Sequence, residues 1–461
     1  MTKHHYMGPL FTDFYELTMA AGYFKQHMVE KATFSVFIRN HTAKRDYFVA
    51  AGLEDVLHEL KNSRFSESDI RYLQTSGLFP EKFLEYLKKF RFSGEIFAIP
   101  EGTIFFPDEP LLEITAPLIQ AQLFETFILN ALGFQTMIAT KAARCIHAAD
   151  GRPLIDFALR RAQGTDAGIK VARSTYIAGF QATSNVLAGK IFDIPLSGTM
   201  AHSYVTAFDN EHQAFSAYAR TFPKNSVFLI DTYDVIEGTR NAVRVGLEMQ
   251  SRGDFLVGVR LDSGDMADLS CRVRRILDDA GLDYVKIFAS SGFDEFKIAD
   301  VIQRGAKIDA FGVGTKMGVS ADAPYLDIVY KMVRFRDKNI RKLSPGKVTL
   351  AGRKQVFRRT GPGGCCLEDV IGTREEHIPG STPLLKKVVE NGRLVRPGPS
   401  LPVIRENFRR NFADLDEKYK ASGLRALFPI RLSTRLKALQ DQTAAAPARR
   451  RDGKQEKYHN G

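Results

Sequence analysis

Small, hydroxyl-bearing and charged residues recur directly after short apolar segments of this sequence. Asp231 follows one segment, Asp262-Ser263-Gly264 follows another that carries Arg260 near its end, and Ser290-Ser291-Gly292 follows a third. Related groups after other segments are Arg160 and Arg161, Ser197-Gly198-Thr199 with His202, and Gly312 with Gly314-Thr315-Lys316. Backbone amides must approach an anion closely to bind it, and small residues permit that approach. The recurrence therefore predicts a surface that binds phosphate groups.

Alternating strands and helices are predicted to position these residues. The candidate strands are Leu154 to Phe157, Ile194 to Leu196, Val227 to Ile230, Leu256 to Leu261, Val285 to Ala289 and Ile308 to Val313. Helical periodicity covers Gly168 to Leu187, Val235 to Met249 and Asp294 to Arg304. Repeated βα units give parallel strands, and six of them favour an irregular α/β barrel over an open sheet. Loops after the carboxyl ends of such strands share one face, so the chemical residues should meet there.

The remaining segments predict an additional α+β domain. Residues 1–120 combine a helical pattern from Asp13 to Phe24, an alternating strand from Thr33 to Arg39 and turn-rich short strands from Gly94 to Ala116. The barrel should occupy residues 121–333. Residues 334–440 return to a β pattern at Lys347 to Leu350 and Gln355 to Arg358, and we expect them to pack back on the N-terminal domain. Residues 441–461 are expected to form a disordered tail.

Composition excludes several classes of protein. A formal charge of +12 suits either nucleic acid or an enzyme with phosphorylated substrates. Lys and Arg are dispersed among acidic residues, and no stripe of alternating basic and aromatic residues is present, so nucleic acid is not an expected partner. Four cysteines without CxxC spacing predict neither zinc nor a disulfide framework and suit the cytoplasm. No apolar run approaches the length of a membrane span.

Two common phosphate-binding motifs do not explain the glycines. The pattern GxxxxGK[ST] is absent, and Gly312-Val313-Gly314 continues to Gly318 with the wrong spacing for GxGxxG. A P-loop kinase and a Rossmann dehydrogenase are therefore disfavoured.

At these residues the sequence resembles the nicotinate phosphoribosyltransferases, from about Thr12 to beyond Arg358. The ordered motifs are TDFYELTM (Thr12 to Met19), DFALRRAQG (Asp156 to Gly164), TSNVLAG (Thr183 to Gly189), SGTMAHSYV (Ser197 to Val205), IDTYD (Ile230 to Asp234), GVRLDSGD (Gly258 to Asp265), FGVGT (Phe311 to Thr315) and PGKVTLAGRKQV (Pro345 to Val356). The resemblance implies a two-domain fold with an irregular α/β barrel. It also implies a homodimer in which the partner's N-terminal segment completes each active site.

The activity implied by the resemblance belongs to NAD salvage. Such an enzyme transfers the phosphoribosyl group of phosphoribosyl pyrophosphate to nicotinate, releasing nicotinate mononucleotide and pyrophosphate. The resemblance also implies coupling of this transfer to ATP hydrolysis and a requirement for Mg²⁺, which we expect to be held mostly by substrate oxygens and water, with no metal ligand assigned among the residues.

The resemblance also implies roles for single residues. His202 becomes the histidine that ATP phosphorylates, with Asp231 accepting a hydrogen bond from its other ring nitrogen. Arg260 should lie against the substrates, and Asp262 should hold ribose hydroxyls. The remaining residues implied to bind substrate are Ser291 and Gly292, the 5′-phosphate pocket of Gly312, Gly314 and Thr315, and the pyridine-stacking pair of Phe157 and the partner's Tyr15.

Specificity for the acid rests on Ser184. At this position, as we align them, nicotinamide-specific relatives carry an Asp, and a serine with Arg160 or Arg161 nearby favours a carboxylate over an amide. Which of the two arginines faces the ring stays open, because Ala158-Leu159 departs from the glycine usual after this Phe. A nicotinamide phosphoribosyltransferase is the alternative, and a quinolinate enzyme would call for a denser arginine cluster.

Overall fold

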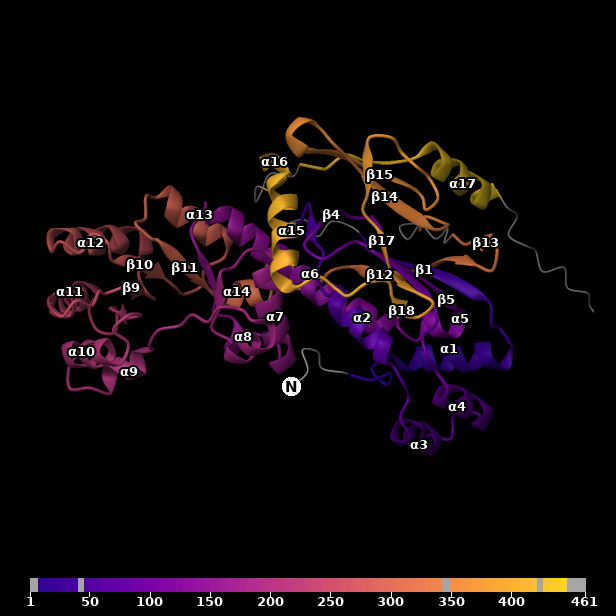
Figure 1. Ribbon diagram of the computed structural model, residues 1–461, viewed down its shortest axis with the longest axis horizontal. Helices are drawn as coiled ribbons and strands as arrows, with labels where there is room; N and C mark the ends of the chain where they lie inside the picture. Colours follow the sequence, from indigo (N-terminus) through magenta and orange to yellow (C-terminus); the bar gives the residue numbers. More distant parts are fainter. Residues whose placement is uncertain (1–6, 40–44, 342–348, 421–425, 446–461) are drawn as a thin grey trace, which may run out of the picture.

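The computed structural model describes residues 7–39, 45–341, 349–420 and 426–445. Two sheets of different character dominate this part of the chain and lie at opposite ends of its long axis (Figure 1). One is parallel and carries the residues expected to do chemistry. The other is antiparallel and is built from both ends of the sequence.

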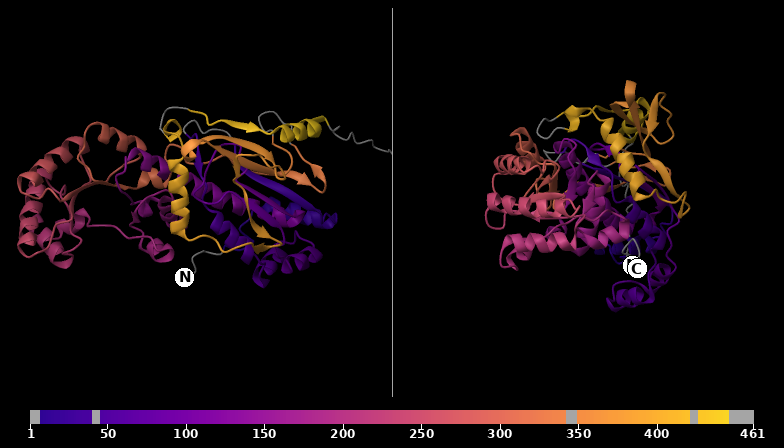
Figure 2. Two further views of the ribbon diagram at one scale, coloured as in Figure 1. Left: turned by 45° about the horizontal axis from the view of Figure 1, so that its top comes forward. Right: turned by 60° about the vertical axis from the view of Figure 1, so that its left-hand side comes forward.

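The parallel sheet has six strands and confirms the predicted α/β class. Its order is β7 (Ala182–Thr183), β6 (Leu154–Asp156), β11 (Ala310–Val313), β10 (Lys286–Ala289), β9 (Gly258–Leu261) and β8 (Val227–Leu229). Figure 2 shows this sheet curled, with helices along its outer side. The helices that follow or join these strands along the chain are α7 (Thr165–Ile177), α8 (Val186–Phe192), α9 (His202–Thr206), α10 (Glu211–Thr221), α11 (Val235–Ser251), α12 (Met266–Asp279) and α13 (Glu295–Gln303). Among the described residues β7 and β8 are edge strands, so the sheet is a half-barrel and not a closed ring.

Two sequence predictions in this region were wrong in detail. The helix predicted from Gly168 to Leu187 is two helices with β7 between them. Gly179 ends the first with a φ of +107°, and the Asn185 side chain starts the second by accepting a hydrogen bond from the Ala188 amide. The strand predicted from Ile194 to Leu196 makes only a single bridge, from Leu196 to Thr183.

The antiparallel sheet interleaves distant parts of the sequence. Its order is β13 (Lys338–Asn339), β12 (Ile328–Phe335), β1 (Lys31–Ile38), β5 (Leu112–Pro117), β3 (Glu95–Ala98), β17 (Lys386–Glu390) and β18 (Arg393–Leu394). A four-stranded sheet lies nearby and contains β16 (Ser381–Pro383), β14 (Lys354–Thr360), β15 (Cys366–Thr373) and β19 (Ile430–Leu432). A short pair joins β2 (Phe48–Val49) to β4 (Ile104–Phe105). Strand β17, from the C-terminal part of the chain, pairs with β3 from the N-terminal part.

Helices around the antiparallel part complete the fold. They are α1 (Phe14–Lys25), α2 (Leu53–Asn62), α3 (Glu67–Thr75), α4 (Glu81–Lys88), α5 (Leu118–Gln122), α15 (Leu401–Ala413), α16 (Glu417–Lys420) and α17 (Thr434–Ala445). Two 3-10 turns, η1 (Leu159–Arg161) and η2 (Pro362–Gly364), occur elsewhere. The predicted helix at 13–24 and strands at 33–39 and 355–358 are present. Half of the strand predicted at 347–350 lies outside the described residues, and its described residues 349 and 350 are not in a strand. Most of the expected tail, from 446 on, also lies outside the described residues, although helix α17 runs to Ala445.

Helix α6 (Glu125–Ala148) joins the two parts of the molecule. Its first half packs in the core of the antiparallel part through Ile128 and Leu132, and its second half packs in the core of the parallel part through Ile138 and Ala142. Its sequence is apolar on nearly every side, as expected of a helix buried all round. The two sheets therefore share one continuous helical support, and the division of the chain at residue 120 stays a prediction.

Candidate functional site

A cavity of about 620 Å³ opens between the two edge strands of the parallel sheet. The predicted residues Phe157, Ser184, Arg260 and Gly312 line it. The other lining residues are Ile155, Thr183, Val186, Leu196, Ser197, Gly198, Thr199, Tyr218, Phe222, Asn225, Val227, Val257, Phe288 and Ala289. An apolar cavity with a few converging polar groups is the usual form of a small-molecule site.

Arg260 is held rigidly at the wall of this cavity. One terminal guanidinium nitrogen donates to the Thr199 hydroxyl and the other to the Met200 carbonyl, each over 2.8 Å. Its Nε is buried and has no hydrogen-bond partner among the described residues. Burial lowers the pKa of Arg260, while Asp262 and Asp231 oppose that change. The arrangement offers a fixed, partly desolvated cation to a ligand.

Asp231 and Asp262 tie together the ends of three neighbouring strands. Asp231 Oδ2 accepts from the Asp262 amide at 2.9 Å and from the Ser263 hydroxyl at 2.7 Å, and Ser290 donates to Asp262 Oδ1. Asp231 Oδ1 is buried and has no partner among the described residues. The predicted meeting of the loops after β8, β9 and β10 is therefore present.

His202 makes a different contact from the one expected. It begins helix α9, and its Nδ1 lies 3.2 Å from the Thr232 hydroxyl, whereas Asp231 is engaged by the loop after β9. The expected hydrogen bond to Asp231 is thus replaced by one to the next residue along the chain. Asp231 and Thr232 both lie in the loop after strand β8. The loop that contacts His202 was therefore predicted correctly, but the contacting side chain was not.

Phe157 packs so closely against Gly312 and Gly314 that neither position has room for a side chain. A Cβ added at Gly312 would lie 2.5 Å from the Phe157 ring, and one at Gly314 would lie 3.0 Å from the Phe157 carbonyl oxygen. Contacts this short cannot be relieved without moving the ring or the backbone. Gly312 therefore fixes the position of the aromatic face in the cavity wall.

Replacing Gly312 by alanine should push the Phe157 ring into the cavity. Because the ring is the expected stacking surface for a flat ligand, we expect the apparent KM for the aromatic substrate to rise about tenfold, as a loss of about 1.4 kcal/mol implies. Steady-state kinetics check the result. The matched control is Gly398→Ala, where a Cβ meets nothing within 4 Å. An unchanged KM in Gly312→Ala would contradict this role of the ring.

The loops after β10 and β11 lie side by side because these strands pair in parallel. Ser291 and Gly292 both have positive φ, at +90° and +66°, and the Ser291 carbonyl accepts a 2.8 Å hydrogen bond from Lys297. Gly314 precedes the short helix α14 (Thr315–Gly318). A non-glycine residue at positive φ is strained, and such strain is often found in ligand-binding loops. These residues adjoin the cavity wall at Gly312.

Four of the fourteen predicted site residues line the cavity, and Arg160, Arg161 and Tyr15 are among those that do not. Arg160 and Arg161 lie on η1 and are exposed. Tyr15 is on helix α1, at the other end of the molecule from the parallel sheet (Figure 1). Tyr15 can therefore reach a site of this kind only on another copy of the chain.

Sequence reasoning missed part of the cavity wall. Tyr218, Phe222 and Asn225 come from helix α10 and the loop after it, where apolar residues at helical spacing look like ordinary core. Thr199 and Ser290 stood within recognised groups after strands but were not singled out. Because loops after the carboxyl ends of parallel strands share one face, every hydroxyl residue in those loops could have been included as a candidate, and Thr199 and Ser290 would then have been found.

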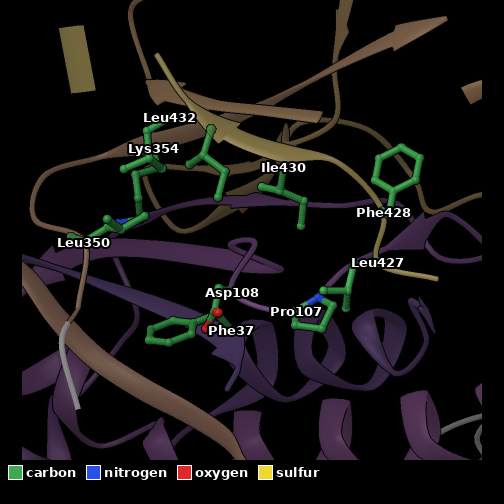
Figure 3. A pocket seen from close by; sticks show the side chains of 10 residues that line it. Phe37, Pro107, Asp108, Leu350, Lys354, Leu427, Phe428, Ile430 and Leu432 are labelled. Atoms are coloured by element: carbon green, nitrogen blue, oxygen red, sulfur yellow. The ribbon is translucent and has the colours of Figure 1, made fainter. Parts of the chain in front are cut away.

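A second cavity, of about 430 Å³, lies in the antiparallel part and is seen in Figure 3. Its labelled side chains are mostly apolar and converge from several segments, with Asp108 and Lys354 as the charged exceptions. Lys354 is already paired with Glu113 at 2.9 Å. This cavity contains none of the predicted residues.

Within the described residues, no helix combines the length and hydropathy that crossing a bilayer requires. In the same part of the chain, no three His, Cys, Asp or Glu side chains are grouped in a way that could hold a metal ion.

Comparison with known proteins gives consistent matches along the chain. Residues 10–133 match the nicotinate phosphoribosyltransferase (NAPRTase) N-terminal domain, and residues 153–345 match the nicotinate phosphoribosyltransferase (NAPRTase) family. A nicotinate phosphoribosyltransferase of Mycobacterium tuberculosis is 45% identical, covering 95% of this chain and 94% of that protein. One from Bacillus subtilis is 39% identical, covering 92% of each. The crystal structure of human nicotinic acid phosphoribosyltransferase has a TM-score of 0.83 at 29% identity, over 94% of this chain and 99% of that one.

Proposed function

Because this chain belongs to the nicotinate phosphoribosyltransferase family, we propose that it transfers the phosphoribosyl group of phosphoribosyl pyrophosphate to nicotinate in NAD salvage. The products are nicotinate mononucleotide and pyrophosphate. The observation that carries the proposal is the cavity in which Phe157, Ser184 and Arg260 face a common space. An aromatic face, a hydroxyl and a fixed cation are what a flat, anionic ring and a polyphosphate require.

The transfer forms a bond from the pyridine nitrogen to ribose C1′ and breaks the bond from C1′ to the pyrophosphate oxygen. In the transition state C1′ gains positive character and the leaving pyrophosphate gains negative charge. Arg260, already oriented by Thr199 and Met200, stabilises that charge without reorganising. Asp262, whose Oδ1 accepts a hydrogen bond from Ser290, is proposed to accept hydrogen bonds from the ribose hydroxyls.

Mg²⁺ is part of the proposal as the partner of the pyrophosphate. Mg²⁺ is usually bound by one or two carboxylates together with substrate phosphates and water. Asp231, whose buried Oδ1 has no hydrogen-bond partner in the described part of the chain, and Asp262 beside it fit that requirement. Bound there, the ion would neutralise charge on the leaving group.

ATP is proposed as a further substrate that phosphorylates His202. Arg260 donates hydrogen bonds to Thr199 and Met200, and His202 is two residues after Met200 in the sequence. A phosphoryl group on His202 would add negative charge next to the segment that Arg260 holds. Phosphorylation could thereby alter the position of Arg260, which gives the proposed coupling a physical route.

The active enzyme is proposed to be a homodimer with shared sites in the cytoplasm. Apolar side chains at the cavity mouth are open to solvent, with Val186 67% and Leu196 55% exposed. On α1, Phe14 and Tyr15 are 56% and 46% exposed. In a homodimer, the exposed apolar face of α1 on one subunit would cover the exposed apolar residues at the cavity mouth of the other subunit. The partner's Tyr15 would then close the ring site opposite Phe157.

Ring specificity tests the proposed function most directly. The wild-type enzyme should use nicotinate far better than nicotinamide, because Ser184 can donate to a carboxylate. Ser184→Asp should lower kcat/KM for nicotinate by about a hundredfold through charge repulsion, and should raise the rate with nicotinamide, whose amide can donate to the new carboxylate. Parallel assays with both rings measure the ratio.

The control for ring specificity is Ser197→Asp, which adds the same charge elsewhere on the cavity wall. It should weaken nicotinate use without any gain for nicotinamide. A wild-type preference for nicotinamide would favour the alternative enzyme, a nicotinamide phosphoribosyltransferase.

A further inference from the structure

Five charged side chains form a buried cluster behind the parallel sheet, which we name the charged clamp: Arg45, Lys141, Arg144, Glu295 and Asp322. Lys141 Nζ lies 2.5 Å from Glu295 Oε2 and 2.7 Å from Asp322 Oδ1. Arg144 Nε donates to Glu295 Oε1 over 2.8 Å. Arg45 forks onto both carboxylate oxygens of Asp322 at 2.7 and 2.9 Å. The side chains of Lys141 and Glu295 are fully buried.

The two carboxylates of the clamp, Glu295 and Asp322, lie a few residues after the two loops that adjoin the cavity. Glu295 is the first residue of α13, which begins shortly after Ser291-Gly292. Asp322 follows the short helix α14, which begins after Gly314. Helix α6 contacts both α13 and α14, and it supplies Lys141 and Arg144 (Figure 1). One pair of cations on one helix therefore holds both loops.

Stability alone does not account for such a cluster. Removing charges from water costs several kcal/mol each, and well-packed apolar side chains usually stabilise a core as well as ion pairs do. What ion pairs with short, directed contacts add is a fixed geometry. Here that geometry also includes the strained Ser320, whose φ is +46° and whose hydroxyl accepts from Arg45 at 3.1 Å.

We propose that the charged clamp is a positioning device that sets the spacing of the loops after β10 and β11 for the 5′-phosphate of phosphoribosyl pyrophosphate. The inference rests on the proposed function for the identity of that ligand. Arg45, which precedes β2 in the antiparallel part, makes the spacing depend on how that part sits against the sheet. The clamp residues do not line the cavity and act only through the loops.

The test compares two carboxylate-to-amide substitutions at buried ion clusters. Asp322→Asn weakens the contacts with Arg45 and Lys141 in the clamp. Glu113→Gln does the same to Lys354 and Arg374 in the antiparallel sheet. Asp322→Asn should raise the KM for phosphoribosyl pyrophosphate on the order of tenfold while the KM for nicotinate stays near wild type, because only the phosphate loops shift. Glu113→Gln should leave both values near wild type.

Hydrogen exchange gives a readout that needs no substrate. Amides of the loops after β10 and β11 should exchange faster in Asp322→Asn than in wild type and Glu113→Gln. Equal exchange in all three proteins, or the same KM change in both variants, would overturn the positioning role. If Asp322→Asn does not fold, Arg45→Lys keeps the charge, loses the forked contact and takes its place. Failure of wild type to bind phosphoribosyl pyrophosphate by titration would overturn the proposed function, while the exchange result still decides the clamp.

Discussion

Arg260→Ala should lower the rate of phosphoribosyl transfer by about a hundredfold or more while the protein stays folded. Removing a preorganised donor to developing charge commonly has an effect of this size, because the lost interaction is strongest in the transition state. The loss should appear chiefly in kcat, measured at saturating nicotinate, phosphoribosyl pyrophosphate and Mg²⁺. Arg240→Ala on the exposed face of α11 is the matched control and should leave kcat unchanged.

The same variant can test whether the two subunits share their sites. Tyr15→Ala alone should also be impaired, because the partner's site loses one aromatic face. Unfolding and refolding the two variants together at equal amounts makes half of the dimers mixed, and each mixed dimer then has one site with both defects and one with neither. Activity should recover to about a quarter of wild type. No recovery would place Tyr15 outside any shared site and leave the Arg260 result standing.

The parallel sheet was largely predictable from the sequence. Strands β6, β8, β9, β10 and β11 all lie within predicted segments, because each is a short apolar run flanked by a turn and a helix. Strand β7 was missed because it is only two residues long and sits between two helices whose periodicities join across Gly179. The irregular barrel was predicted, but counting strands does not show whether the two edge strands pair, so its half-open form was not evident from the sequence.

Part of the candidate site was predictable from the position of residues at the carboxyl ends of parallel strands. Phe157, Ser184, Arg260 and Gly312 line one cavity because the carboxyl ends of parallel strands share a face. Their roles in binding stay predictions. The contact between His202 and Thr232 was not predictable, because neighbouring residues after one strand differ only in side-chain direction.

The charged clamp was beyond the reach of sequence patterns. Its ion pairs join Lys141 to Asp322 across 181 positions and Arg45 to Asp322 across 277. Periodicity reports which face of an element is apolar, and a lysine or arginine in a buried helix reads as a break in that pattern. Only the packing of α6 against α13 and α14 shows that those breaks are matched by carboxylates.

His202→Ala should abolish the stimulation of transfer by ATP while leaving the unstimulated rate near wild type. A neutral imidazole is a competent nucleophile toward a phosphoryl group, and His202 stands on the segment that Arg260 holds without lining the cavity itself. The phosphoryl group would form a bond to a ring nitrogen as ADP leaves. Initial rates with and without ATP measure the effect, and ³²P from the γ-position should label wild type but not the variant.

The control for this result is His212→Ala, on the exposed side of α10 beside Glu248, which should keep both the stimulation and the label. Thr232→Val adds a finer test, because it removes the hydroxyl next to His202 Nδ1 without removing the histidine. If that hydroxyl orients the ring, labelling should slow in Thr232→Val while its final extent is kept. Stimulation that persists in His202→Ala would separate ATP from this histidine and leave Arg260 and the cavity to account for the transfer alone.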